Sequence, residues 1–126
     1  GIEELIKKSD VVTLHLPLDD STRNIMNQER LQMLKSSAVL INLARGGLVD
    51  EKALKKMLFE RRIAGAALDV FEVEPLLDKD FSLMDNVLIT PHIGGSTEEA
   101  ILAMGIAAID GLDNAKDPLE FVQLKD

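Results

Sequence analysis

The sequence has 126 residues, enough for one domain with a hydrophobic core. Its 14 lysines and arginines are scattered among 22 acidic residues, for a net charge of −8, so we expect no nucleic-acid partner. No apolar run is long enough to span a bilayer and no signal peptide opens the sequence, so we expect no membrane partner. The absence of cysteine fits a reducing compartment, and we expect a cytoplasmic protein.

The first part of the chain predicts two short helices and two strands. Residues 1–9 have apolar positions at helical spacing and two lysines near the end, where cations suit the helix dipole. Residues 11–16 form an apolar run rich in β-branched residues, which is typical of a strand. Asn27 can cap a short helix that extends to Leu34, and a second apolar strand follows at residues 38–43.

A glycine-rich turn connects this second strand to the next helix. Gly46 and Gly47 allow a sharp turn where a side chain would clash. Asp50 is a good N-cap for a helix at residues 50–60, because its carboxylate can accept hydrogen bonds from the first helical turn. After this helix, the small residues at 64–69 predict a third strand against which a helix can pack closely.

A fourth strand and a long helix complete the pattern. A loop with one helical turn near Phe81 leads to the strand at residues 87–90. Ser96 and Glu99 have the spacing of a capping box, in which each side chain satisfies the other residue's backbone amide. We therefore expect a helix at residues 97–112, with an inner stripe formed by Ala100, Ile101, Met104, Ala108 and Leu112.

The alternation of strands and helices predicts an α/β fold, with about four neighbouring parallel strands and flanking helices. Residues 113–126 are predicted to form an irregular C-terminal tail. The tail residues available for docking are Leu119, Phe121, Val122 and Leu124.

Polar residues follow the ends of the predicted strands. His15, Arg45, Asp69 and His92 come at or just after the four strand ends, and Glu74 lies in the loop after the third strand. Because the carboxyl ends of parallel strands meet at one edge of a sheet, we expect these side chains around one crevice. A cation, an acid/base candidate and two acids suit a small-molecule site.

Each of these residues also has a purely structural interpretation. Arg45 can pair with a nearby acid, and His15 can be a satisfied histidine in the core. Asp69 can cap a turn, and Glu74 before a proline can be a solvated loop acid. The residues individually leave both interpretations open, and the ordered set favours function. Two histidines and no cysteine predict no metal site.

Four ordered segments resemble a known family. They are His-Leu-Pro at residues 15–17, Ala-Arg-Gly-Gly at 44–47, Ala-Ala-Leu-Asp-Val-Phe-Glu-Val-Glu-Pro at 66–75, and Thr-Pro-His-Ile-Gly-Gly-Ser-Thr at 90–97. In this order they resemble the D-isomer-specific 2-hydroxyacid dehydrogenases, over about residues 5–108. The Gly-Gly-Ser-Thr ending is most similar to the phosphoglycerate dehydrogenase branch. The resemblance implies that residues 1–112 form the second half of a Rossmann-like doubly wound, NAD-binding domain.

The resemblance implies catalytic roles for three residues. Arg45 would bind the substrate carboxylate through two donors. His92 would be the acid/base, which takes the hydroxyl proton during oxidation and returns it during reduction. Glu74 would hydrogen-bond His92 and hold its tautomer.

The implied cofactor is NAD, and the sequence does not distinguish it from NADP. Asp69 would accept a hydrogen bond from the nicotinamide carboxamide, and Gly94 and Gly95 would allow the cofactor to approach closely. The residues implied to line the cofactor are His15, Pro17, Leu43, Ala44, Arg45, Asp69, His92, Gly94 and Gly95.

The chain departs from the family in one large respect: it contains no G-x-G-x-x-G turn, no acid to bind the ribose hydroxyls and no substrate domain. We therefore interpret it as a fragment of an oxidoreductase that transfers a hydride between NAD(H) and a D-2-hydroxy acid or 2-oxo acid, and expect the isolated chain to be inactive. The alternatives are a dinucleotide-sensing, corepressor-like binding module and a purely structural, self-associating half-domain.

The strand at residues 11–16 would lack a neighbour in such a fragment. It is apolar and contains no proline or lysine that would block pairing with another chain. We therefore expect a homodimer in which two copies of this edge pair antiparallel about a two-fold axis.

Overall fold

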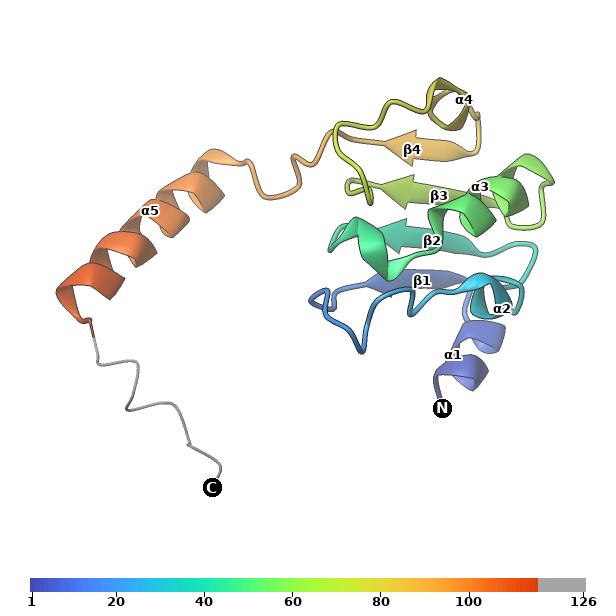
Figure 1. The fold of residues 1–126 in the computed structure, drawn as a ribbon, viewed down its shortest axis with the longest axis horizontal. Helices are drawn as coiled ribbons and strands as arrows, with labels where there is room; N and C mark the ends of the chain where they lie inside the picture. Colours follow the sequence, from blue (N-terminus) through green and yellow to red (C-terminus); the bar gives the residue numbers. More distant parts are fainter. Residues whose placement is uncertain (116–126) are drawn as a thin grey trace. The chain divides into compact units, whose positions relative to one another are not determined.

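The structure is a computed structural model, and it describes residues 1–115 (Figure 1). The chain forms two compact units, Gly1–Gly94 and Gly95–Asp126. The predicted boundary after residue 112 stays a prediction, and the proposed docking residues of the tail lie outside the described residues. The elements in chain order are α1 (Ile2–Lys8), β1 (Val11–Leu14), α2 (Gln28–Leu31), β2 (Val39–Asn42), the 3-10 turn η1 (Gly46–Leu48), α3 (Glu51–Phe59), β3 (Gly65–Leu68), α4 (Lys79–Ser82), β4 (Val87–Ile89) and α5 (Glu98–Asp113).

Four parallel strands form one sheet in the order β1-β2-β3-β4 (Figure 1). This arrangement confirms the predicted α/β fold with four parallel strands. The pairing register places the last residues of the strands in one row across the sheet: Leu14, Asn42, Leu68 and Ile89. Each strand therefore ends one or two residues earlier than predicted, because the sheet pairing stops at this row and the polar residues begin the turns beyond it.

One face of the sheet carries the core. In β1, Val12 and Leu14 are buried, whereas Val11 and Thr13 are exposed, as expected for side chains that alternate between two faces. Figure 1 shows α3 crossing in front of β2 and β3. The residues that α3 buries in the core are Leu54, Met57 and Leu58.

Side-chain caps begin four of the described helices, α2, α3, α4 and α5. The carboxylate of Asp50 accepts from the amide of Ala53 at 2.9 Å, which confirms the predicted N-cap of α3. The predicted capping box at Ser96 is wrong. The N-cap of α5 is Thr97, whose hydroxyl accepts from the amide of Ala100. Two adjacent hydroxyl residues compete for this position, and with Thr97 as cap the third helical residue is an alanine, which has no side-chain acceptor to return the bond.

The apolar stripe predicted on α5 is not buried within the described chain. The helix has no buried residue, and Ile101, Met104 and Leu112 are all more than half exposed. Leu102 and Ile109 are also apolar and exposed, so the apolar residues of this helix surround it instead of defining one inner face. Within residues 1–115, no helix combines the length and apolar character that a membrane crossing requires.

Candidate active site

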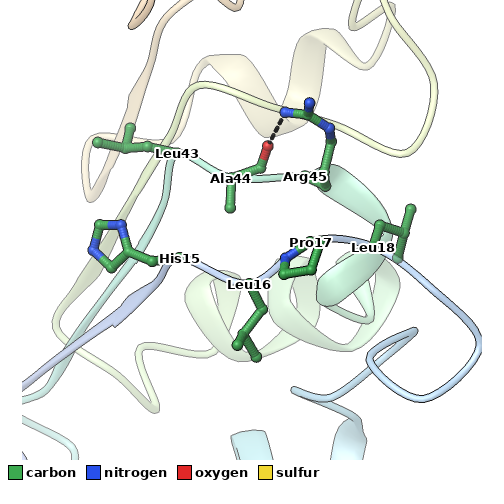
Figure 2. A pocket seen from close by; sticks show the side chains of 7 residues that line it. All are labelled: His15, Leu16, Pro17, Leu18, Leu43, Ala44 and Arg45. Carbon is green, nitrogen blue, oxygen red and sulfur yellow. Dashed lines mark hydrogen bonds between the residues drawn. The ribbon is translucent and has the colours of Figure 1, made fainter. Parts of the chain in front are cut away.

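A buried asparagine shapes the turn that presents Arg45. Asn42 is the last residue of β2 and is fully buried. Its side-chain oxygen accepts from the amide of Ala44 at 3.1 Å, and its Nδ2 donates to the carbonyl of Arg45 at 2.9 Å. The turn is thus tied to the strand end, and the exposed Arg45 side chain donates from Nη1 to the carbonyl of Ala44 (Figure 2).

Gly46 brings this turn against the loop that follows β3. A Cβ built on Gly46 would lie 1.9 Å from the carbonyl carbon of Phe71. The glycine is therefore required for close packing of two backbones. None of the glycines in residues 1–115 has a positive φ, so left-handed geometry is not the reason for it. The contact sets Arg45 near the loop that contains Glu74.

Glu74 and His92 form a pair at the edge of the sheet. Nδ1 of His92 lies 2.8 Å from Oε2 of Glu74, and Oε1 of Glu74 accepts from the amide of Phe71 at 2.9 Å. The hydrogen bond with His92, followed by the one from Phe71, lowers the pKa of Glu74. An ionised carboxylate only accepts hydrogen bonds, so the proton of the pair is on Nδ1 and Nε2 is left to exchange a proton.

Asp69 is buried directly beneath the His92 turn. Its Oδ1 accepts from the Thr90 hydroxyl and from the amide of Ile93, the latter at 2.9 Å, and its Oδ2 accepts from the amide of Gly94 at 2.8 Å. Burial would raise the pKa of Asp69, but these three hydrogen bonds together outweigh it and the pKa is lowered. Asp69 thus remains ionised at neutral pH inside the fold.

Three neighbouring cavities collect the predicted site residues other than Gly94 and Gly95. His15, Pro17, Leu43, Ala44 and Arg45 line a cavity of about 700 Å³, together with Leu16 and Leu18 (Figure 2). Arg45, Glu74 and His92 line a second cavity of about 340 Å³. Asp69, Glu74 and His92 border a third, of about 490 Å³. Arg45 is therefore shared by the predicted cofactor cavity and the cavity that contains the predicted catalytic residues.

The larger cavity fits one end of a dinucleotide. Figure 2 shows residues 15–18 and residues 43–45 as its two walls, which offer an imidazole, backbone groups and flat apolar side chains. The 126 residues contain no G-x-G-x-x-G turn, so they do not themselves form a pyrophosphate cradle. The residues that could line a bound cofactor at this cavity are His15, Pro17 and residues 43–45, and their role toward it stays a prediction.

The structure decides between the two interpretations of His15 and shows what surrounds Gly94 and Gly95. His15 lies beyond β1, is exposed, and has its Nε2 3.0 Å from the hydroxyl of Thr13, so the core-histidine interpretation is wrong. Gly94 packs closely on Asp69, whose Oδ2 would lie 2.9 Å from an added Cβ, and its role toward the cofactor stays a prediction. Nothing lies within 4 Å of a Cβ added at Gly95.

Sequence reasoning missed three residues of the site. Asn42 donates a hydrogen bond to the carbonyl of Arg45, and the Thr90 hydroxyl donates one to Asp69. Arg23 lines the smallest of the three cavities. A polar residue within the apolar strand was the available signal for Asn42. No such signal marked Arg23, because its approach to Gly47 depends on the tertiary fold. No group of three or more His, Cys, Asp or Glu residues within residues 1–115 could hold a metal ion.

A four-stranded parallel sheet with these residues at its carboxyl edge has the architecture of a Rossmann-type dehydrogenase domain. Residues 1–94 match the family described as "D-isomer specific 2-hydroxyacid dehydrogenase, NAD binding domain", and the chain belongs to this family. The resemblance of its motifs is thereby confirmed, and the expectation of NAD as cofactor is confirmed at the level of the family.

Known relatives agree with this assignment. The chain is 52% identical over 104 residues to the D-3-phosphoglycerate dehydrogenase of Methanocaldococcus jannaschii, covering 82% of this chain and 20% of the relative. It is 52% identical over 103 residues to the glyoxylate reductase of Pyrococcus furiosus, covering 82% and 31%. The D-isomer specific 2-hydroxyacid dehydrogenase of Lactobacillus delbrueckii ssp. bulgaricus, solved in its NAD-complexed form, superposes with a TM-score of 0.78 at 34% identity, covering 94% of this chain and 41% of that one.

The chain thus spans less than half the length of these proteins. The names of the relatives do not favour the corepressor-like module or the purely structural half-domain.

Proposed function

We propose that this chain supplies the catalytic residues of an NAD-dependent dehydrogenase that interconverts small D-2-hydroxy acids and 2-oxo acids. The observation that carries the proposal is the Glu74–His92 pair, which lines the same cavity as Arg45. This reaction needs a guanidinium to hold the substrate and, beside it, an imidazole bonded to a carboxylate to move a proton.

Each residue has a role that follows from its geometry. Arg45 offers a fork of donors to the substrate carboxylate and fixes the orientation of the neighbouring carbon. Nε2 of His92 takes the hydroxyl proton during oxidation and returns it during reduction. Glu74 holds Nδ1 and stabilises the imidazolium that forms when Nε2 is protonated. The bound NAD supplies the hydride acceptor or donor.

Replacing part of a known enzyme tests this proposal. The 103 matched residues of the Pyrococcus furiosus glyoxylate reductase are exchanged for the corresponding residues of this chain. We expect the grafted enzyme to oxidise NADH with glyoxylate or hydroxypyruvate, and to lose this activity with His92→Ala. A grafted enzyme that is folded by circular dichroism and inactive with 2-oxo acids would contradict the proposal.

For the 126-residue chain by itself, the proposal includes self-association. β1 lies at one edge of the sheet, and its Val11 is 57% exposed. Two such edges related by a two-fold axis perpendicular to the sheet would pair antiparallel and form one continuous sheet. We also place the protein in the cytoplasm, where the nicotinamide cofactor and small 2-oxo acids occur together.

The mass of the purified chain in solution, measured by light scattering, tests the dimer. Val11→Lys is the suitable variant, because Val12 is buried and a lysine there would disturb the core. Leu88→Lys is the matched control, since Leu88 is an exposed apolar residue of β4, at the opposite edge. We expect a dimer that only Val11→Lys dissociates, and a monomeric wild-type chain would contradict the proposal.

A further inference from the structure

We propose that Asn42 and Asp69 are positioning residues: one holds the turn that carries Arg45, the other holds the turn that carries His92, and together they set the arrangement of the two catalytic groups. The kinetic part of this inference rests on the proposed function. Its structural part does not.

Burial singles these two side chains out. Among residues 1–115, Asn42 and Asp69 are the only buried polar or charged residues, with exposed fractions of 0% and 2%. Burying such groups is costly unless every polar atom is satisfied. Both are satisfied, and apart from the Thr90 hydroxyl their partners are backbone groups of the two turns that carry the catalytic residues.

Asn42 acts on the turn after β2. Its side chain is both a donor and an acceptor, and it uses the two functions on consecutive residues, Arg45 and Ala44. Such a pair of bonds fixes the path of the chain between the end of the strand and the guanidinium. The side chain of Arg45 bonds only its neighbour's carbonyl among the described residues, so its place is set by the backbone that carries it.

Asp69 acts on the turn after β4. His92 has a φ of 55°, in the left-handed region that non-glycine residues rarely adopt. A conformation of this kind persists when the surroundings hold it. The two amides that follow His92, those of Ile93 and Gly94, both donate to Asp69, and the Thr90 hydroxyl before it does the same. Asp69 therefore accepts hydrogen bonds from residues on both sides of His92.

The two positioning residues are also joined to each other. The amide of Asp69 donates to the carbonyl of Asn42 at 3.1 Å, as the last bond between β2 and β3. The two anchoring side chains thus stand at the ends of adjacent strands, β2 and β3, and the His92 turn that Asp69 holds follows β4, the next strand of the same sheet. A shift in either side chain changes the distance between the substrate-binding cation and the proton carrier.

Amide hydrogen exchange in the 126-residue chain tests the structural part without any activity. In the wild type, we expect the amides of Ala44, Ile93 and Gly94 to be protected, although none lies in a helix or strand. We expect Asn42→Leu to speed exchange at Ala44, and Asp69→Asn to speed it at Gly94, each by roughly tenfold to a hundredfold. Exchange of these three amides at unprotected rates in the wild type would overturn the inference, even if neither variant folds.

Matched controls separate positioning from general destabilisation. Asn86 also donates from Nδ2 to a backbone carbonyl, that of Leu58 at 3.1 Å, before the start of β4. Asp78 also accepts from a backbone amide, that of Phe81 at 3.0 Å. We expect Asn86→Leu and Asp78→Asn to leave exchange at Ala44, Ile93 and Gly94 unchanged. Equal acceleration by the controls would overturn the inference.

The kinetic part uses the grafted enzyme described above. Asn42→Leu should mainly raise KM for the 2-oxo acid, because Arg45 is displaced. Asp69→Asn should mainly lower kcat, by up to about 10²-fold, because the imidazole is displaced from the reacting atom. The two control variants should change neither constant. Parallel changes of KM and kcat in all four variants would overturn the kinetic part, whereas a wholly inactive graft would count against the proposed function and leave the exchange result to decide the rest.

Discussion

Oε2 of Glu74 lies 2.8 Å from Nδ1 of His92, although 18 positions separate the two residues in the chain. The other oxygen of Glu74 is held by the amide of Phe71, so the carboxylate cannot rotate away without losing a second bond. The imidazole is thereby oriented from its Nδ1 side, and its Nε2 side is left for the substrate. This relationship determines what each substitution in the pair should do.

In the grafted enzyme, His92→Ala should lower kcat by about 10²–10⁴-fold, the usual contribution of general acid/base catalysis. Glu74→Gln should lower kcat less, because an amide can still bond the imidazole but does not stabilise its charged form. Steady-state kinetics at several concentrations of 2-oxo acid measure both effects. Near-normal turnover by His92→Ala would mean that another group carries the proton, and His15 would be the next candidate.

Arg45→Ala should have a different kinetic signature. Its main effect should be a higher KM, because the lost guanidinium would bind the substrate carboxylate. Some loss of kcat should follow from misorientation of the substrate. Arg62→Ala is a suitable control, since Arg62 is exposed and follows α3 at the opposite end of the sheet. A normal KM in Arg45→Ala would contradict the assigned role.

The isolated 126-residue chain should show no measurable NADH oxidation with 2-oxo acids. Its residues contain no G-x-G-x-x-G turn for the pyrophosphate. The grafted enzyme is the positive control for the same assay. Robust turnover by the chain alone would refute the interpretation of these residues as an incomplete active site.

Gly46→Ala should destabilise the fold by about 1–3 kcal/mol, since an added methyl group must displace backbone atoms of Phe71 and Glu72. Gly105→Ala is the matched control, because nothing lies within 4 Å of a Cβ at this position of α5. There the same change should stabilise the helix by about 0.5–1 kcal/mol. Urea unfolding of the three proteins measures the difference, and a neutral Gly46→Ala would show that the two loops are not packed as described.

The stability of the fold should fall in acid partly through Asp69. The pKa of Asp69 is lowered on folding from the usual value of 3.8. Ionisation of this carboxyl group is therefore more favourable in the folded state than in the unfolded state. The resulting stabilisation is present above pH 3.8 and is lost as the pH falls through the lower, folded pKa. The free energy of unfolding of the wild type minus that of Asp69→Asn should therefore shrink across this range. A difference that does not change with pH would contradict the assignment.

The arrangement of the sheet could be predicted because its signals are local. Apolar runs of four to six residues, separated by caps such as Asp50 and by turn residues, define the strands and their order. Once the strands are parallel, the edge at which Arg45, Asp69 and His92 gather follows from geometry alone. The juxtaposition of Arg45, Glu74 and His92 around one cavity was predictable for this reason.

The features that were missed depend on contacts between distant segments. A polar residue in an apolar strand marks Asn42, but the groups that its side chain bonds, and the packing of Gly46 on Phe71, depend on the folded turns. The choice of Thr97 over Ser96 as N-cap depends on where the preceding turn ends. Periodicity suggested an apolar stripe on α5, but whether such a stripe is buried depends on what packs against the helix, which periodicity alone does not show.

The bonds made by Asn42 and Asp69 reach mainly main-chain atoms, and a main-chain bond does not depend on the side chain of the residue that makes it. Leu43 and Ile93 are each 52% exposed, and Ala44 is half-buried. These three side chains can be exchanged while the guanidinium and the imidazole keep their places. The side chains that these turns carry can therefore change by point substitution without loss of the two anchored groups, and a library that randomises Leu43 and Ala44, which line the larger cavity, is the natural starting point for testing this tolerance.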